Sequence, residues 1–435
     1  MNSYPIYKDS GQPWLGTIPA HWNTRRLKYL VSNINEQKSV KSEHEIYIAL
    51  EHIEGSTGKL TVPDEEIAFE SNVKCFRRQD VLFSKLRPYL AKAVIPEQDG
   101  VCVGELLVLR SANEMVPRFL LYSLLAKPTI DIIAGSTFGA RMPRADWGFI
   151  GNLRFQLPNR TEQATIVAYL DRKTADIERF ISKKKKLIAL LNEQKAAIIN
   201  RAVTKGLNPD VPMKASGVAW LGKVPAHWDV VPLKRRWTVT DCKHLTVDFV
   251  DEGVPVASIG EVKGMRINLI SAKRTTENEF LKLIEGNRQP RPGDIIYSRN
   301  ATVGEAAFVD TDVKFCMGQD VSLIRSVTQN QRFLVYQLRS PFVLHQLEQS
   351  MIGSTFRRIN VSDIKMLLVC CPPLDEQDTI VHVLDNELQT FQEAISKAER
   401  EIELINEYRT TLISDVVTGK IDVRQAEGAA EILTT

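Results

Sequence analysis

The 435-residue sequence predicts an α+β protein with two similar globular domains, separated by two long α-helices that form an antiparallel coiled coil. Three observations predict this fold. One long unit occurs twice, each copy ends in a stretch of heptad hydrophobic spacing, and the rest of each copy mixes short β-like runs with Pro and Gly. The predicted order is a domain over 1–158, a helix over 159–206, a second domain over 207–373, a helix over 374–420 and a flexible tail over 421–435.

The repeat is visible in short motifs. Trp14–Trp22 (WLGTIPAHW) recurs as Trp220–Trp228 (WLGKVPAHW), at an offset of 220 − 14 = 206 residues. Asp80 in RQDVLFSK corresponds to Asp294 in PGDIIYSR, at an offset of 294 − 80 = 214 residues. A repeat of this length indicates a duplicated domain with an appendage, since solenoid repeats run to about 20–50 residues. Two further motifs recur: Gly-Ser-Thr-Phe at 135–138 and 353–356, and Glu-Gln at 162–163 and 376–377.

The globular part of each copy is predicted to be α+β. Short runs of apolar and β-branched residues occur at 46–50 and 101–103 in the first copy and at 253–257 in the second. Pro and Gly punctuate these runs, which is typical of short strands joined by turns.

The last part of each copy is predicted to be one long helix. No Pro or Gly interrupts residues 161–205 or 374–418, and Gly206 and Gly419 then provide stops. At 1.5 Å per residue, about 45 residues make a rod of roughly 65 Å. Two rows, each with a period of seven residues, predict a coiled-coil seam. Its apolar members are Leu170, Ile177, Ile181, Ile188, Leu191, Ile198, Leu384, Leu388, Phe391, Ile395, Ile402, Ile405 and Leu412.

Each helix has the other as an obvious partner, because neither can leave its apolar stripe in water. The second domain lies between them in the chain, so the chain can follow one rod outward and return antiparallel along the other. The alternative is that each helix packs on its own domain. The seam rows also contain the cationic residues Lys184, Lys195 and Arg409.

The formal net charge of +3 means that binding to an acidic polymer must come from local basic patches. Basic residues cluster near corresponding turns of both copies, where guanidinium groups can reach phosphates or the O6 and N7 edge of guanine. For any single arginine a solvated surface is an equal alternative, but the set as a whole favours nucleic-acid binding. Two interpretations of the mid-helix run Lys183–Lys186 stay open, a face toward DNA beside the helix and a solvated face, and we favour the second, except that Lys184 occupies a seam position. The candidate DNA-binding residues are Arg77, Arg78, Lys85, Arg87, Arg141 and Arg144 in the first copy and Arg288, Arg291, Arg299, Arg357 and Arg358 in the second.

The sequence predicts no catalytic residue and no metal site. It contains no GxGxxG, P-loop or GxSxG motif. Asp248 and Glu261, followed by a lysine, have a loose nuclease-like spacing that the first copy does not share. Cys242 and His244 lack a second ligand pair at metal spacing.

The two repeated histidines, His21 and His227, lie between Ala and Trp, with no acid or nucleophile at a shared spacing around either of them. A turn after proline followed by tryptophan indicates a packing corner, so we interpret these histidines as structural.

Over nearly the whole chain, the duplicated order of domain, long helix, domain and long helix resembles the specificity subunit of type I restriction-modification systems. The motifs that carry the resemblance are Trp14–Trp22 and its copy Trp220–Trp228, the Gly-Ser-Thr-Phe turns, and the Glu-Gln steps that open each helix. The resemblance implies two target-recognition domains, each reading one half of a bipartite double-stranded DNA site. The two copies have diverged most in their middles, which predicts an asymmetric site. It also implies that the coiled coil sets the spacing between half-sites and docks methyltransferase subunits.

The same resemblance implies that the chemistry belongs to partners. Two methyltransferase subunits would bind S-adenosylmethionine, and restriction subunits that translocate DNA would use ATP and Mg²⁺. This chain is then expected to bind no cofactor and to be no enzyme by itself.

Two other function classes stay open at this point: a coiled-coil scaffold that does not bind DNA, and a metal-dependent nuclease that uses Asp248 and Glu261. The N-terminus lacks the pattern of a signal peptide, and no apolar run approaches the ~20 residues of a membrane span. We therefore expect a cytoplasmic protein, and the resemblance implies that it is DNA-associated and comes from a bacterium or archaeon.

Overall fold

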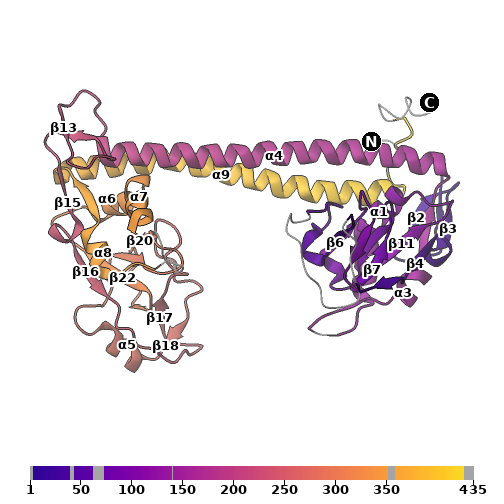
Figure 1. Ribbon diagram of the computed structural model, residues 1–435, viewed down its shortest axis with the longest axis horizontal. Helices are drawn as coiled ribbons and strands as arrows, with labels where there is room; N and C mark the ends of the chain where they lie inside the picture. The colour runs from indigo at the N-terminus through magenta and orange to yellow at the C-terminus, as the bar shows by residue number, and fades with distance from the viewer. Residues whose placement is uncertain (1–2, 40–43, 62–72, 140, 351–357, 426–435) are drawn as a thin grey trace. The chain divides into compact units, whose positions relative to one another are not determined.

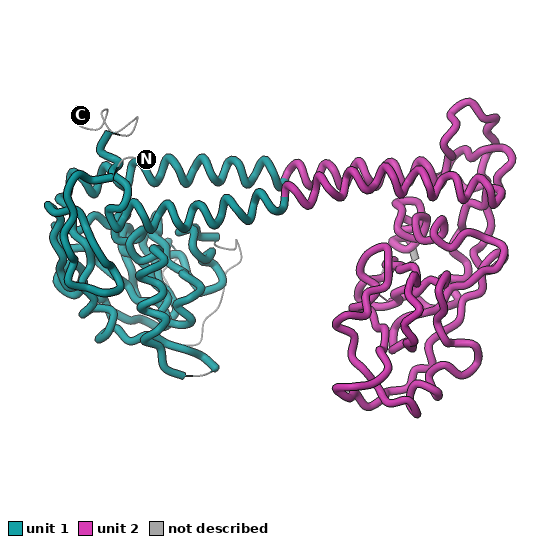
Figure 2. The backbone as a smooth tube through the Cα atoms, turned by 180° about the vertical axis from the view of Figure 1, so that it is seen from behind, with its two compact units in different colours: residues 1–185, 399–435 teal, residues 186–398 magenta. Residues whose placement is uncertain are grey.

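A computed structural model describes residues 3–39, 44–61, 73–139, 141–350 and 358–425. The chain forms two compact units, one made of residues 1–185 with 399–435 and the other of residues 186–398 (Figure 2). They are called unit 1 and unit 2 below.

Two long helices dominate the secondary structure (Figure 1). Helix α4 spans Arg160–Lys205, with 46 residues, and helix α9 spans Leu374–Val417, with 44 residues. Gly206 and Gly419 follow them with φ of 77° and 78°, the left-handed conformation that glycine adopts without strain after a helix. The two predicted helices are confirmed.

The globular part of unit 1 contains two four-stranded sheets. One has the antiparallel order β4-β11-β8-β9, and the other has the order β5-β7-β10-β6, in which β10 and β6 run parallel. Strand β12 pairs with β3 immediately before α4 begins. The strands are β1 Tyr7–Asp9, β2 Thr17–Pro19, β3 Asn23–Arg26, β4 Val31–Ile34, β5 Gln37–Lys38, β6 Ile46–Ile48, β7 Val73–Phe76, β8 Val81–Ser84, β9 Ala93–Val94, β10 Gly100–Cys102, β11 Leu106–Ser111 and β12 Arg154–Leu157.

The globular part of unit 2 repeats this topology. The sheet order β16-β22-β19-β20 corresponds to β4-β11-β8-β9, and β17 pairs parallel with β21 as β6 does with β10. Helix α5, Glu277–Ile284, lies in this domain, and the corresponding stretch of the first copy falls outside the described residues. The strands are β13 Met213–Ala215, β14 Lys223–Pro225, β15 Asp229–Pro232, β16 Thr238–Asp241, β17 Val254–Ala257, β18 Arg274–Thr275, β19 Ile295–Ser298, β20 Ala306–Phe308, β21 Cys316–Met317, β22 Val321–Arg325 and β23 Leu368–Cys371.

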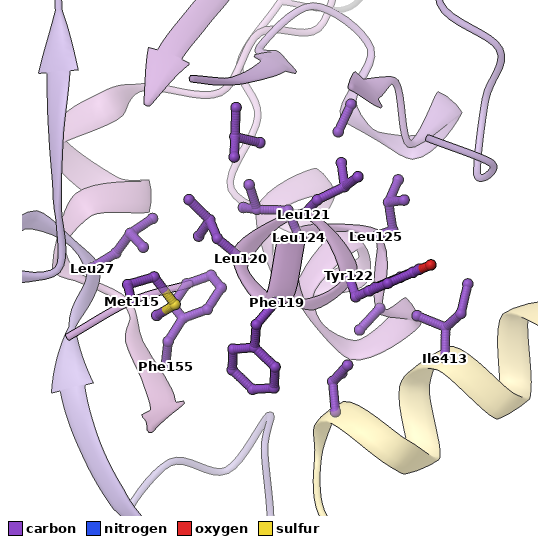
Figure 3. Close-up of a cluster of buried hydrophobic side chains, with 14 of the residues drawn as sticks. Leu27, Met115, Phe119, Leu120, Leu121, Tyr122, Leu124, Leu125, Phe155 and Ile413 are labelled. Atoms are coloured by element: carbon purple, nitrogen blue, oxygen red, sulfur yellow. The ribbon is translucent and has the colours of Figure 1, made fainter. Parts of the chain in front are cut away.

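The core of unit 1 joins the sheet to both long helices. Helices α1, Pro117–Leu125, and α2, Lys127–Gly135, pack in it, and α3, Trp147–Asn152, lies beside them. Ile413 of α9 points into this cluster (Figure 3). Other members from the long helices are Ile166, Leu170, Leu412, Val416 and Val417.

The core of unit 2 is built in the same way around α6, Gln331–Leu338, α7, Pro341–Ser350, and α8, Val361–Met366. Here the long helices contribute Ile199, Ala202 and Val203 of α4 and Ile380, Val381, Leu384 and Leu388 of α9.

The two helices are antiparallel. In unit 1 the start of α4 shares a core with the end of α9, and in unit 2 the end of α4 shares a core with the start of α9. Arg409 and Lys184, two of the seam cations, form ion pairs across the helices in unit 1, with Glu178 and Glu401. Each helix therefore packs both on its partner helix and on a globular domain, so the two alternatives weighed from the sequence occur together.

None of the predicted apolar seam residues is exposed. Leu170, Ile177, Ile181, Leu384, Leu388, Ile395 and Leu412 are buried, and the other six are half-buried.

The packed part of the chain extends beyond the predicted boundary at residue 420. Val423 is buried in the unit 1 core, and the guanidinium of Arg424 lies 4.7 Å from the ring centroid of Tyr4. The tail predicted over 421–435 is thus anchored at its start, since an apolar and a cationic side chain there find partners in the first domain.

Candidate nucleic-acid interface

The repeated histidine lies against the acidic residue at the start of each long helix. In unit 1, Nε2 of His21 is 2.9 Å from Oε2 of Glu162, and Tyr4 Oη donates to the other carboxylate oxygen at 2.8 Å. In unit 2, Nε2 of His227 is 2.7 Å from Oε2 of Glu376. The histidines thus have a structural partner that sequence reasoning missed, although both glutamates were already visible in the repeat.

The next residue of each helix is a fully buried glutamine that ties the helix to its own domain. Gln163 Oε1 accepts a hydrogen bond from Val116 N at 2.8 Å, and its Nε2 donates to Pro158 O at 2.9 Å. Gln377 makes the matching pair of bonds in unit 2. These bonds explain why Glu-Gln recurs at both helix starts.

A Tyr–Asp pair repeats two turns further along each helix. Tyr122 Oη donates to Asp171 Oδ1 at 2.5 Å, and Arg118 Nε donates to the same oxygen at 2.9 Å. Burial first, and then the hydrogen bond to the carboxylate, raise the pKa of Tyr122 to about 12, so the phenol stays a donor. Tyr336 and Asp385 repeat this pair at 2.6 Å in unit 2.

The far end of each long helix is bonded to the other domain at corresponding positions. In unit 1, Ser414 Oγ of α9 accepts from Lys127 N at 2.9 Å. In unit 2, Asn200 Oδ1 of α4 accepts from Phe342 N at 2.9 Å. Each domain is therefore fixed to the start of one helix and the end of the other, a rigid support for a binding surface.

Two loops of unit 1 meet beside the main sheet and carry candidate residues. Arg87 N donates to Pro143 O at 2.8 Å, and Arg144 forms bridges to Leu86 and Phe138. These bonds bring residues 85–91 next to residues 137–139 and 141–144. The exposed side chains there, which we call the unit 1 loop surface, are Arg87, Tyr89, Leu90, Phe138, Arg141 and Met142.

The unit 1 loop surface combines cationic and apolar groups. Tyr89, Phe138 and Met142 are 56%, 64% and 45% exposed, and Arg87 and Arg141 form no ion pair among the described residues. Arg87 has φ of 48°, a conformation that is strained for a residue with a Cβ and that clusters at functional sites. Exposed aromatic and guanidinium groups together suit phosphates and base edges or faces.

The corresponding loops of unit 2 are joined at matching positions in the part that the structure describes, but they carry different side chains. Asn300 forms a bridge to Arg358, and Ile359 N donates to Arg299 O at 2.9 Å. Ala301 has φ of 56° and lies 301 − 87 = 214 residues after Arg87. The left-handed backbone conformation therefore recurs in unit 2, but an alanine takes the place of the arginine.

A second pair of turns presents three further candidates. Arg77, Arg78 and Arg291 are exposed and form no ion pair within the described ranges. Their turns are held by a buried carboxylate: Asp80 Oδ2 accepts from Arg77 N at 2.8 Å, and Asp294 Oδ2 accepts from Arg291 N at 2.7 Å.

Four predicted DNA-binding arginines bond to the protein itself. Arg144 binds Glu105 with two nitrogens, Arg288 donates to the backbone oxygens of Asp241 and Glu285, and Arg358 lies 3.6 Å from Asp320. The prediction for Arg299 is wrong, because its side chain is only 4% exposed and its Nη2 lies 2.8 Å from Asp241 Oδ1. Lys85 is half-buried, and Arg357 lies outside the described residues.

The structure does not bring the nuclease-like acids together. Asp248 is exposed with its backbone oxygen bonded to Thr275, whereas the Glu261 carboxylate accepts from Ser258 N at 2.8 Å.

The one group of potential metal ligands within the described part of the chain consists of Asp241, Cys242 and His244. His244 Nε2 is 3.1 Å from Asp241 Oδ2, and Cys242 Sγ is 3.6 Å from His244 Nδ1. The guanidinium of Arg299 already lies at this point, 3.7 Å from the sulfur, and its fixed positive charge opposes a second cation.

No described helix has the length and apolar character that a membrane crossing requires.

Residues 246–404 match the family model of the type I restriction modification DNA specificity domain. The chain is 24% identical over 337 residues to the MjaVIII specificity subunit of Methanocaldococcus jannaschii, covering 75% of each chain. It is 24% identical over 225 residues to the EcoDI specificity subunit of Escherichia coli, covering 49% of this chain and 50% of that one.

A solved structure from work on complex assembly and conformational transition of the type I restriction-modification system has the same fold. The TM-score is 0.70 at 18% identity, with 93% of this chain and 99% of that chain covered. The shared fold therefore includes both globular domains and both long helices.

Proposed function

We propose that this chain, which belongs to the family of type I restriction-modification DNA specificity subunits, reads a bipartite, asymmetric DNA site with one half-site on each globular domain. One observation carries the proposal: the bonds that attach each domain to the long helices are repeated, whereas the loops that the two domains expose have diverged. The histidine, glutamine and tyrosine bonds to the long helices recur in both units, whereas the strained loop position carries Arg87 in one domain and Ala301 in the other.

The long helices are proposed to set the spacing between the half-sites. Each is one continuous helix of 46 or 44 residues, roughly 65 Å at 1.5 Å per residue, which exceeds the 34–36 Å of one DNA turn. Helices without a break hold register better than linkers do.

The catalytic steps are proposed to belong to partner subunits. Methyltransferase subunits would bring S-adenosylmethionine, and restriction subunits would bring ATP and Mg²⁺. This chain would supply the DNA address and a docking surface for two methyltransferase subunits.

Exchanging residues 1–158 for those of a relative tests the proposal. We expect the methylated sequence to change in one half-site and to stay the same in the other, because the second domain keeps all of its own contacts. Sequencing of methylated positions in cells that carry the hybrid subunit and its partners measures this. A change in both half-sites would refute independent readers.

The unit 1 loop surface gives a more local prediction. Arg87→Ala should weaken duplex binding and reduce the slope of log K against log salt by about 1 if the guanidinium contacts a phosphate. Arg87→Lys is the matched variant. If the side chain contacts a phosphate, lysine should keep the salt slope. If it contacts a guanine, lysine should lose discrimination between bases, because only arginine binds the base edge with two nitrogens. Fluorescence anisotropy at several salt concentrations measures both, and a wild-type chain that binds no duplex even at low salt would favour the scaffold.

A further inference from the structure

One seam cation of the coiled coil is neutralised within the protein. In unit 1, the guanidinium of Arg409 pairs with the carboxylate of Glu178, and Lys59 pairs with the second oxygen of that carboxylate. The Arg409 side chain is only 9% exposed. A single carboxylate therefore bridges a helix cation and a cation from the globular domain.

The corresponding place in unit 2 lacks this carboxylate. Lys195 corresponds to Arg409, since 409 − 195 = 214, and Gln392 corresponds to Glu178, since 392 − 178 = 214. This is the offset that relates Asp80 to Asp294. The repeat has thus kept the cation and replaced the acid by an uncharged amide.

Lys195 and Gln392 line a cavity of about 450 Å³ that lies wholly within unit 2. Lys195 is half-buried and forms no ion pair among the described residues. Burial lowers the pKa of its ammonium, and the like charge of Arg339 lowers it further. A positive charge thus lies in this cavity without the partner that its counterpart has.

The other charges of the cavity are already paired, in part with Asp385, which also lines it. The Arg332 guanidinium and the Tyr336 hydroxyl both bind Asp385, at 2.6 Å each. Arg266 lines the same cavity and pairs with Asp310, but its side chain remains 65% exposed and has donors left over.

We propose that this cavity binds a phosphate group, held by Lys195 and Arg266 in the role that the Glu178 carboxylate plays in unit 1. A phosphate has enough acceptor oxygens for an ammonium and a guanidinium at once. The cavity, within the usual range for small-ligand sites, has room for the rest of a phosphorylated compound. The phosphate comes either from such a compound or from a DNA backbone.

The test compares thermal unfolding of the full chain in inorganic phosphate and in chloride of equal ionic strength, without DNA. At ten times its dissociation constant, phosphate should raise the melting temperature of the wild type by about 3–5 °C. Gln392→Glu supplies the missing carboxylate, so this variant should melt higher than wild type in chloride and should lose the phosphate response. Lys195→Gln should lose the response as well.

Two outcomes would overturn the proposal: a wild type that responds no more to phosphate than to chloride, or equal responses in the wild type and in Gln392→Glu. The absence of DNA from this assay keeps its failure distinct from a failure of DNA recognition. A second experiment, with DNA present, identifies the source of the phosphate. A backbone phosphate is indicated if Lys195→Gln lowers the salt slope of duplex binding by about 1, and a free compound if the slope is unchanged and adenosine monophosphate competes with phosphate.

Discussion

Replacing Trp22 by alanine should lower the free energy of unfolding of unit 1 by about 3–5 kcal/mol, the loss typical of a buried tryptophan. Its indole is fully buried between the first domain and the end of α9. Gly419 lies so close that a Cβ there would come within 3.1 Å of the ring. Alanine would therefore leave a cavity where the C-terminal helix meets the first domain.

Denaturant unfolding followed by circular dichroism measures this loss. Trp228→Ala is the matched variant, because Trp228 is equally buried and packs on Gly206 at the end of α4, so it should destabilise unit 2 by a similar amount. Trp22→Phe, which keeps most of the apolar volume, should cost much less. Equal stability of Trp22→Ala and the wild type would contradict the packing described for this corner.

Asp294→Ala should cost about 3–5 kcal/mol, because it leaves a partly buried guanidinium without its partner. The Asp294 carboxylate accepts from Arg325 Nε at 2.7 Å and from Nη2 at 2.6 Å. It also accepts from Arg291 N, so the loss loosens a turn that presents a candidate DNA contact.

The repeat supplies the control for this prediction. Asp80 binds Arg110 in the same way, but the Arg110 side chain is 33% exposed whereas that of Arg325 is 18% exposed. Water can solvate Arg110 more easily, so Asp80→Ala should cost less than Asp294→Ala. The double variant Asp294→Leu with Arg325→Met should recover much of the loss, because no unpaired charge remains. A reversed order of the two single variants would show that burial of the arginine does not determine the loss.

The long helices were predictable because heptad spacing and the absence of Pro and Gly are local signals. The predicted helix ranges of 159–206 and 374–420 differ from Arg160–Lys205 and Leu374–Val417 by three residues at most. The duplication was also predictable from the sequence, because it appears as matching motifs.

Contacts that depend on chain pairing were not predictable. Glu162 lies 141 residues from His21 along the chain, and no local pattern shows that the two side chains meet. Arg299 looks like any basic residue after a strand, and only the position of Asp241, at the end of β16, shows that the guanidinium is buried in an ion pair. The sequence thus predicted the candidate site as a set of basic loops. It could not predict which of their arginines lack an acidic partner, because the acids that pair with the others lie far away in the sequence.

The attachment of the first domain to the last turns of α9 has a consequence for synthesis on the ribosome. Leu412, Val416 and Val423 complete a core whose other members lie mostly before residue 171. At roughly 5–20 residues per second, the 417 − 158 = 259 residues between the end of this domain and the end of α9 take about 13–50 s to translate. During that interval the nascent domain exposes apolar side chains that the last turns of α9 and Val423 later cover. A chain truncated before α9 would keep them exposed and be a substrate for chaperones and proteases.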